Sequence, residues 1–300
     1  MAERERPVTI DLQGLTKWYG PTRGIIDLSF QVFSGEVFGF LGPNGSGKTT
    51  AIRTTLGLIK PTNGRAYLLG TEIPIKNLSL RNRIGYLPGI AALYDNYTAR
   101  GYLHFMAEMR KKDLRSVIEI YAERLDLKLD QHIHDLSKGN RQKVALIQAF
   151  MHSPDLLFLD EPTSGLDPLV QREFEIMLDE CRARGASVLL SSHILSEVEH
   201  LADRVAILNQ GKAIAIDEIA SLKARARRQI SLHFDRVISS SDFNGIDHIK
   251  EVAISDHSMH CVITGSEHDL LRRAVELGVD EVRTQESSLD EIFLDLVASQ

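Results

Sequence analysis

The sequence has few cysteines and no long apolar segment. Only two cysteines, Cys181 and Cys261, occur among 300 residues, so disulfide bonds cannot stabilise a fold of this size and a reducing compartment is expected. No apolar stretch approaches the roughly 20 residues that a membrane-spanning helix needs, and the charged amino terminus has no signal-peptide core. If the protein acts at a membrane, another chain must therefore cross it.

Proline and glycine are too sparse for a collagen-like or low-complexity chain, with 9 and 21 residues. Basic residues are not in excess either. The net charge is −6, and the acidic excess lies from Asp217 to the end, so the preceding part is close to neutral. A protein that binds nucleic acid normally carries an excess of basic residues. We therefore expect no nucleic acid as a main partner.

Residues 1–217 alternate short apolar strands with amphipathic helices. An alternating apolar pattern over residues 24–32 predicts a half-exposed antiparallel strand. Continuous apolar runs at 156–160 and 187–192 predict strands buried on both faces, as in a parallel sheet covered by helices. Further strands are expected at 8–12, 36–42 and 204–217, the last as a hairpin around Asn209–Gly211, and helices directly after Gly47 and at 98–110, 114–126, 137–151 and 168–184.

Residues 218–300 have a different pattern, which predicts a small α+β unit. Ser288 and Glu291 have the spacing of a capping box, so a terminal helix is expected over 288–298. No pattern of catalytic residues is recognised in this region, and we interpret it as an accessory domain. Strands are expected at 229–234, 249–254, 259–264 and 279–284, and a further helix at 268–278.

The strongest functional motif is GPNGSGKT, Gly42–Thr49, which matches G-x-x-x-x-G-K-[ST] between a predicted strand and a predicted helix. Glycines allow successive backbone N–H groups to turn inward around a phosphate, and the following helix directs its positive end at the same charge. Lys48 can reach the β- and γ-phosphates, and the Thr49 hydroxyl can bind Mg²⁺. The motif predicts a site for a nucleoside triphosphate.

Two carboxylates, Asp160 and Glu161, stand at the carboxyl end of the predicted buried strand 156–160. Ligands bind at this end of the strands in open α/β sheets. An aspartate there suits a second Mg²⁺ contact, and Glu161 could polarise an attacking water. Two acids at a strand end also occur in ordinary solvated turns, but the phosphate loop upstream favours the functional interpretation.

Several further motifs occur in a fixed order, and together they resemble the ATP-binding subunits of ABC transporters over residues 8–215. The segment LSKGNRQKV at 136–144 is similar to the family's signature motif, with Lys138 and Asn140 where glycine and glutamine are commonest. Tyr19 lies where the family stacks an aromatic residue on adenine. TSGLDP at 163–168 resembles the D-loop, and SSH at 191–193 resembles the switch-histidine segment.

The resemblance implies an α/β fold of the P-loop NTPase type, with a mixed sheet, an antiparallel β subdomain and a helical subdomain, followed by the small α+β domain. It implies binding of ATP and Mg²⁺, with Thr49 and Asp160 as metal ligands. Glu161 is then the general base or the residue that positions the water, and His193 contacts the γ-phosphate. The residues implied to hold the triphosphate are Gly42, Pro43, Asn44, Gly45, Ser46, Gly47, Lys48, Thr49 and Thr50.

The resemblance also implies partners. Ser137 and Gly139 would contact the ATP held by a second cassette, so that two nucleotides are buried in a two-fold interface, with a homodimer as the expected assembly. The expected function is an ATPase subunit that energises transport through a separate membrane permease, in the cytoplasm at the inner face of the cell membrane. The final SLDEIFLDL segment resembles the tail of exporter-type subunits, which favours export over uptake.

Two alternative functions stay open. One is a soluble mechanical or regulatory ATPase of the same superfamily. Such translation factors carry two cassettes and such repair proteins carry long coiled coils, whereas this chain has one cassette and no heptad repeat. The other is a small-molecule kinase built on the phosphate loop alone, which leaves the signature, D-loop and switch-histidine segments unexplained.

One position departs from the family pattern. The family has a glutamine that contacts Mg²⁺ where this chain has Gly89, in RIGYLPG. Glycine offers no side-chain ligand. We therefore predict that water or a neighbouring backbone carbonyl completes the Mg²⁺ shell, and that coupling to the permease relies on residues 91–110.

Overall fold

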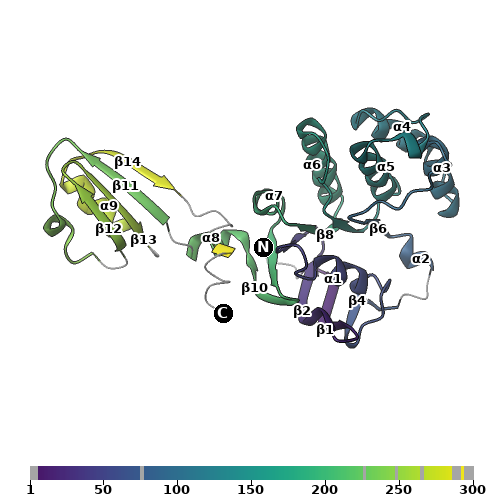
Figure 1. Ribbon diagram of the computed structural model, residues 1–300, viewed down its shortest axis with the longest axis horizontal. Helices are drawn as coiled ribbons and strands as arrows, with labels where there is room; N and C mark the ends of the chain where they lie inside the picture. Colours follow the sequence, from purple (N-terminus) through teal and green to yellow (C-terminus); the bar gives the residue numbers. More distant parts are fainter. Residues whose placement is uncertain are drawn as a thin grey trace. The chain divides into compact units, whose positions relative to one another are not determined.

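The computed structural model describes residues 6–74, 78–225, 228–246, 249–263, 267–285 and 292–293. The chain divides into two compact units, Met1–Ile216 and Asp217–Gln300, each of which is described by itself (Figure 1). We call them the N-terminal unit and the C-terminal unit. The division lies one residue before the boundary expected from the sequence.

A six-stranded sheet forms the centre of the N-terminal unit. Neighbouring strands from β9 to β6 are parallel, so their carboxyl ends meet at one edge. Every residue of β3, β7 and β8 is buried, which confirms the prediction for the continuous apolar runs. In spatial order the strands are β10 (Lys212–Glu218), β9 (Arg204–Asn209), β3 (Val37–Leu41), β8 (Ser187–Ser192), β7 (Leu156–Asp160) and β6 (Ile84–Leu87).

A second, antiparallel sheet has the order β2 (Thr22–Phe33), β1 (Val8–Tyr19), β4 (Asn63–Leu68) and β5 (Thr71–Glu72). The alternating burial of β2 agrees with the half-exposed strand predicted from the sequence. The strand expected at 8–12 is longer and continues to Tyr19. Gly14, at a φ of 61°, lies where the pairing with β2 shifts between Leu12 and Leu15, so the strand passes through a bulge instead of ending.

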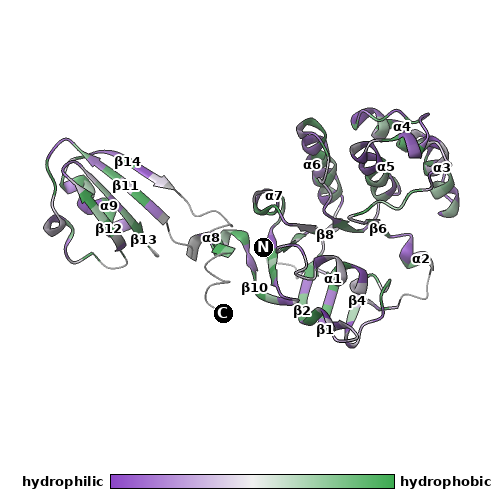
Figure 2. Ribbon diagram, in the orientation of Figure 1, coloured by the Kyte–Doolittle hydropathy of each residue, from purple (hydrophilic) through white to green (hydrophobic). Residues whose placement is uncertain are grey.

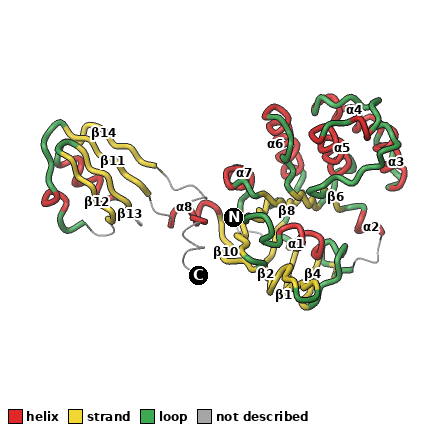
Figure 3. The backbone as a smooth tube through the Cα atoms, viewed as in Figure 1, coloured by secondary structure: helices red, strands yellow, loops and turns green. Residues whose placement is uncertain are grey.

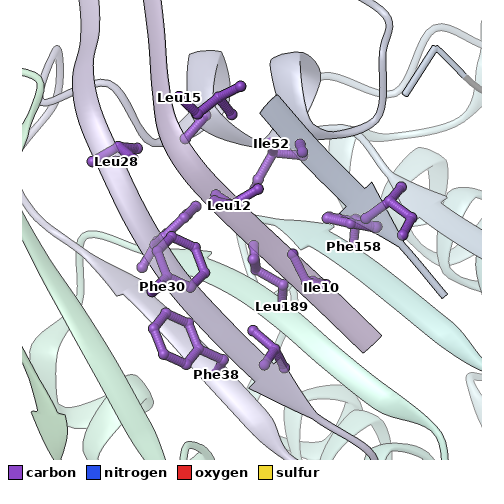
Figure 4. Packing of buried hydrophobic residues seen from close by; sticks show 14 of the residues in the cluster. Ile10, Leu12, Leu15, Leu28, Phe30, Phe38, Ile52, Phe158 and Leu189 are labelled. Carbon is purple, nitrogen blue, oxygen red and sulfur yellow. The ribbon is translucent and has the colours of Figure 1, made fainter. Parts of the chain in front are cut away.

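The two sheets share one apolar core. Phe30 of β2 stacks on Phe38 of β3, with ring centroids 4.7 Å apart and planes inclined by 4°. Figure 4 shows these rings beside side chains from β1, α1, β7 and β8, so that residues far apart in the sequence fill one space. This packing fixes the strand ends that carry the site. The residues labelled there are Ile10, Leu12, Leu15, Leu28, Phe30, Phe38, Ile52, Phe158 and Leu189.

The helices predicted after Gly47 and at 98–110, 114–126, 137–151 and 168–184 are present, whereas two short helices at 78–81 and 195–201 were not predicted. Some of the helices begin at a side-chain cap. Thr98 accepts a hydrogen bond from the Gly101 amide, and Asp167 accepts from Leu169 and Val170 ahead of Pro168 at the first helical turn. Figures 1 and 3 show α3, α4 and α5 grouped apart from the antiparallel sheet, as the predicted helical subdomain. The helices are α1 (Lys48–Thr55), α2 (Leu78–Arg81), α3 (Ala99–Met109), α4 (Arg115–Arg124), α5 (Lys138–Phe150), α6 (Pro168–Ala183) and α7 (Leu195–Leu201).

The C-terminal unit is a four-stranded antiparallel sheet with its own core. Buried Ile230, Leu232 and Phe234 of β11 alternate with more exposed residues, so one face of the sheet packs against α9. Figure 2 shows the same alternation of hydrophobic and hydrophilic residues along β11. Its elements are α8 (Ile219–Arg225), β11 (Arg228–Phe234), β12 (Ile249–Ser255), β13 (Ser258–Ile263), α9 (His268–Glu276) and β14 (Val279–Gln285), in the sheet order β12-β13-β11-β14.

These bounds agree with the predicted strands and helix to within a few residues. The terminal helix predicted over 288–298, with its capping pair Ser288 and Glu291, lies outside the described residues apart from Ile292 and Phe293. Across the part of the chain that the structure describes, no helix combines the length and the apolar character needed to cross a bilayer.

Candidate nucleotide site

The phosphate loop Gly42–Thr49 connects β3 to α1 and is held in a tight backbone turn. Gly42 has a φ of 156° and Gly47 a φ of 109°. A Cβ on Gly42 would lie 2.3 Å from the Leu208 carbonyl oxygen, and one on Gly47 would lie 2.8 Å from the Gly24 carbonyl oxygen. Only glycine fits at these two positions, because the loop passes directly against neighbouring backbone.

The loop is also fixed from outside. The Gly211 amide, in the turn between β9 and β10, donates to the Ser46 carbonyl at 2.9 Å, and the Gly211 carbonyl accepts from the Ile26 amide at 2.7 Å. Ser46 Oγ is buried and has no hydrogen-bond partner within the part of the chain that the structure describes. A buried hydroxyl without a partner fits a loop that binds an anion, because a phosphate oxygen can accept its proton.

Lys48, the first residue of α1, lies beneath the loop and is only 6% exposed. Its Nζ donates to the carbonyl oxygens of Gly42 at 2.6 Å and Pro43 at 3.3 Å, and lies 3.6 Å from Glu161 Oε1. Burial lowers the pKa of Lys48, and the carboxylates of Glu161 and Asp160 oppose this effect. A cation is thus kept next to the turn where a polyphosphate would lie.

Asp160 and Glu161 end β7 beside this loop. Asp160 is buried; its Oδ2 accepts from Thr49 Oγ1 at 2.8 Å and its Oδ1 from Ser191 Oγ at 2.5 Å. Thr49 and Asp160, the two predicted metal ligands, are therefore in direct contact. Two hard oxygen donors this close fit the small oxygen-ligand shell that Mg²⁺ prefers.

Glu161 is held in an uncommon backbone conformation. Its φ is +52°, in the left-handed region that non-glycine residues seldom occupy. Its amide donates to the Ser191 carbonyl at 3.1 Å, and its Oε2 lies 2.6 Å from Nδ1 of His193. The two residues predicted to be catalytic thus touch each other at the carboxyl ends of adjacent strands β7 and β8.

These groups line one open cleft of about 560 Å³. Tyr19 forms part of its wall; the residue is 44% exposed, and Lys17 Nζ lies 5.1 Å from the ring centroid. The exposed ring is available for stacking on a planar base. The predicted residues that line the cleft are Tyr19, Asn44, Gly45, Gly47, Lys48, Thr49, Thr50, Asp160, Glu161 and His193.

The wall also contains residues that were not predicted to bind nucleotide, of which only Ser164 lies in a predicted motif: Thr22, Arg23, Gly24, Arg53, Ile90 and Ser164. Arg23 comes from β2, its stem lies against Gly211, and its Nη1 donates to Gln210 Oε1 at 3.2 Å. No motif marks Arg23, since only the pairing of the sheets brings β2 to the loop. Gly89, at the position where the family has glutamine, lies beside Asp160, and a Cβ there would be 3.3 Å from Asp160 Oδ2.

The signature segment Leu136–Val144 has a different setting. Ser137 is the N-cap of α5, accepting from the Asn140 amide at 3.2 Å, and its own side chain is exposed. A Cβ on Gly139 would lie 2.7 Å from the Gly165 carbonyl oxygen, so the helix start packs directly on the D-loop. Among the described residues that line the cleft, Ser137 and Gly139 are not found.

A turn that fits a polyphosphate, a buried lysine, and a carboxylate bonded to the first-turn threonine define the class: a P-loop nucleoside triphosphatase. Comparison with known proteins identifies the family. A family profile described as "ABC transporter" matches residues 25–164.

Two relatives resemble the chain over much of its length. The chain is 33% identical over 299 residues to the bacitracin transport ATP-binding protein BcrA of Bacillus licheniformis, covering 94% of this chain and 95% of that protein. It is 39% identical over 213 residues to the Nod factor export ATP-binding protein I of Rhizobium meliloti, covering 69% of this chain and 64% of that protein.

The solved structure of an ATP-binding subunit of an ABC transporter superposes with a TM-score of 0.66 at 29% identity, covering 72% of this chain and 92% of that one. The chain therefore belongs to the ABC transporter family, as one of its ATP-binding subunits. The predicted fold class, ATP binding and ATPase activity are confirmed at the level of this family.

Proposed function

We propose that the chain binds ATP with Mg²⁺ in the cleft and hydrolyses it to drive export through a membrane permease formed by another chain. The observation that carries the proposal is the convergence of Lys48, Thr49, Asp160, Glu161 and His193 in one cleft. On this proposal the chain acts in the cytoplasm, at the inner face of the cell membrane.

The residues from Gly42 to Thr50 bind the triphosphate through backbone amides, the Ser46 hydroxyl and the Lys48 ammonium. Tyr19 stacks on the adenine. Thr49 and Asp160 hold Mg²⁺, which when bound neutralises charge on the phosphate oxygens. The 2.8 Å hydrogen bond between these two side chains supports the assignment, because it places the two oxygens next to each other in the cleft.

Hydrolysis proceeds by in-line attack of water on the γ-phosphate. Glu161 accepts the water proton on a carboxylate oxygen, and its fixed backbone positions that oxygen. His193, bonded to Oε2, orients the carboxylate and contacts the γ-phosphate from the adjacent strand. Positioning and charge neutralisation supply most of the rate enhancement, since the transition state needs little covalent help.

Ser137 and Gly139 act on a second cassette, which we propose is another copy of this chain. Both lie at the N-terminus of α5, whose free amides and helix dipole favour an anion. They lie outside the chain's own cleft, and Ser137 is exposed. A single chain therefore holds ATP with one set of donors, and hydrolysis becomes fast when the partner copy supplies the second set.

The permease is proposed to dock on the loop after β6 and on α3. Large apolar side chains are exposed there: Ile90 is 84% exposed, Tyr94 51% and Met109 70%. Tyr94 and Tyr97 pack against each other with ring centroids 6.0 Å apart, which forms a contiguous surface suited to a partner protein. The relatives named for bacitracin transport and Nod factor export support export over the two alternative functions.

The C-terminal unit is proposed as an accessory domain that supports the homodimer. Removing the residues from Asp217 onward should leave ATP binding intact and weaken ATP-dependent dimerisation, measured by sizing with ATP. An equal dimer fraction with and without the unit contradicts this role.

The central test of the function is Glu161→Gln. We expect ATP binding to persist, hydrolysis to fall by at least roughly 100-fold, and a stable ATP-bound dimer to accumulate, since the amide cannot accept the water proton. Phosphate release and size-exclusion chromatography with ATP measure both effects. Glu72→Gln makes the same change on β5, outside the cleft lining, and should leave the rate unchanged. Turnover of Glu161→Gln at the native rate shows that the assignment of the base is wrong.

A further inference from the structure

Glu197, in the first turn of α7, joins two segments that flank the catalytic pair. Its Oε1 accepts a hydrogen bond from Thr163 Oγ1 at 2.6 Å, and its Oε2 accepts one from Ser192 Oγ at 2.8 Å. The donors are buried, Thr163 at 8% and Ser192 at 1% exposure. One carboxylate thus holds two buried hydroxyls from different strand ends.

The two donors lie next to the proposed catalytic residues in the chain. Thr163 follows Glu161 by two residues, and Ser192 directly precedes His193. Strands β7 and β8 are paired up to Asp160 and Ser191, where Ser191 Oγ donates to Asp160. One backbone bond continues past this pair, from the Glu161 amide to the Ser191 carbonyl at 3.1 Å, and Glu161 lies at positive φ. That bond holds the Glu161 backbone but does not reach Ser192 or His193, so the separation of the Glu161 and His193 side chains also depends on contacts further along both segments.

We propose that Glu197 is a positioning residue for hydrolysis: by holding Thr163 and Ser192 together, it keeps Glu161 Oε2 and His193 Nδ1 in contact. The proposal rests on the proposed function, which assigns hydrolysis to that pair. Ser192 Oγ also accepts the Ile194 amide at 2.9 Å, so the same hydroxyl that donates to Glu197 shapes the backbone on the far side of His193. Glu197 itself is partly buried, and hydrogen bonds from hydroxyls to a carboxylate are stronger than bonds between neutral groups.

The geometry predicts that Glu197 affects catalysis more than nucleotide affinity. Glu197 does not appear among the described residues that line the cleft, so ATP does not touch it there. A displacement of about 1 Å between reacting groups costs on the order of 100-fold in rate. Glutamine at this position offers one acceptor oxygen for two hydroxyl donors, so one of the two bonds is lost or reversed.

The first experiment compares Glu197→Gln with Glu199→Gln, which makes the same change two residues further along α7. We expect Glu197→Gln to lower kcat by roughly 10- to 100-fold while the Kd for ATP stays within twofold. This split between kcat and Kd is the readout that a merely structural role would not produce, because a general loss of folding lowers both. Glu199→Gln should retain the native kcat and Kd. A native kcat for Glu197→Gln, or equal losses in kcat and ATP affinity, overturns the proposal.

A second pair of variants keeps the proposal testable if Glu197→Gln unfolds. Thr163→Val removes the donor at constant shape and should lower kcat, whereas Thr163→Ser keeps the hydroxyl and should restore it. Equal rates for the two overturn the proposal.

In a His193→Ala background, Thr163→Val should lower kcat little further, because Thr163 acts through the contact between Glu161 and His193. Glu161→Gln is assayed in parallel to distinguish failure of the proposed function from failure of the positioning role. If Glu161→Gln turns over normally, the proposed function is wrong. If it is inactive, the Glu197 and Thr163 variants test the positioning role alone.

Discussion

The nucleotide cleft and the signature segment Leu136–Val144 both contain the N-terminus of a helix, yet they are built differently. The cleft concentrates buried charge and strain: Lys48 is 6% exposed and Glu161 has a φ of +52°. In the signature segment only Ser137 and Lys138 are exposed, and Ser137 caps its own helix. This difference fits the proposal that Ser137 acts on a second copy of the chain, because Ser137 is not among the described residues that line the chain's own cleft.

The largest expected effect comes from removing the cation of the cleft. Lys48→Ala should weaken ATP binding on the order of 100-fold and abolish hydrolysis, because a charge-assisted contact to the phosphates is lost while Glu161 and Asp160 keep their negative charge. Binding of a fluorescent ATP analogue measures the loss. Lys212→Ala, at an exposed position of β10, is the matched control. If Lys48→Ala binds the ATP analogue within threefold of the native affinity, ATP binding in the cleft does not depend on this lysine.

The next change acts on the signature segment. Ser137→Asp keeps an N-cap acceptor for α5 but brings a carboxylate toward the partner's phosphates. We expect the ATP affinity of the single chain to stay native and ATPase activity to fall at least roughly tenfold, since like charges facing each other across an interface cost several kcal/mol. Ser137→Asn, neutral and also a good cap, is the control. If both variants lose ATP affinity equally, Ser137 contributes to ATP binding by its own chain, and the proposed separation of the cleft from the signature segment is wrong.

The same contrast explains how much could be predicted from the sequence. The loop Gly42–Thr49 and the end of β7 are local: a strand, a turn and a helix in consecutive residues determine their geometry. They were therefore predictable from the sequence. The longer helices, such as α3 and α6, were predictable from their local patterns, whereas the short helices α2 and α7 were not predicted.

Residues that reach the site through pairing of distant strands could not be predicted. Arg23 enters the cleft because β2 pairs with β1 and lies against the turn at Gly211, nearly 190 residues later in the chain. Glu197 could not be singled out from the sequence, because its two partners, Thr163 and Ser192, come together only in the folded chain. The bulge at Gly14 likewise depends on its partner strand, so the end of β1 was predicted too early.

A smaller effect involves the C-terminal end of α5, the helix that begins at Ser137. His152 follows α5, is 2% exposed, and its Nε2 lies 3.1 Å from the Ile84 carbonyl oxygen of β6. Burial lowers the pKa of His152 to about 4, with Arg110 and Lys112 adding to the effect. The unfolded chain, with a pKa near 6.5, binds this proton first, so the stabilisation is complete above pH ~6.5 and is lost as the pH falls toward ~4.

Between pH 7 and 5.5 this linkage should cost about 1 kcal/mol of unfolding free energy. Urea unfolding at both pH values measures the loss, and His152→Gln, which cannot take up the proton, should show a smaller loss over the same interval. Equal losses in the two proteins would mean that the junction between α5 and β6 does not carry the acid sensitivity.

The smallest expected effect concerns Gly89, where the cleft departs from the family pattern. We expect Gly89→Gln to keep ATPase activity within about threefold, because water can complete the Mg²⁺ shell that the amide would otherwise enter. A Cβ at this position lies 3.3 Å from Asp160 Oδ2, so the carboxylate that also bonds Thr49 must move by a few tenths of an ångström. Gly89→Ala introduces the same contact with Asp160 without the amide. The Mg²⁺ concentration that gives half-maximal activity measures how each variant affects Mg²⁺ binding. If glutamine activates strongly while alanine does not, the native cleft lacks a ligand that it needs, and the contrast between a complete cleft and an outward-facing signature segment no longer holds.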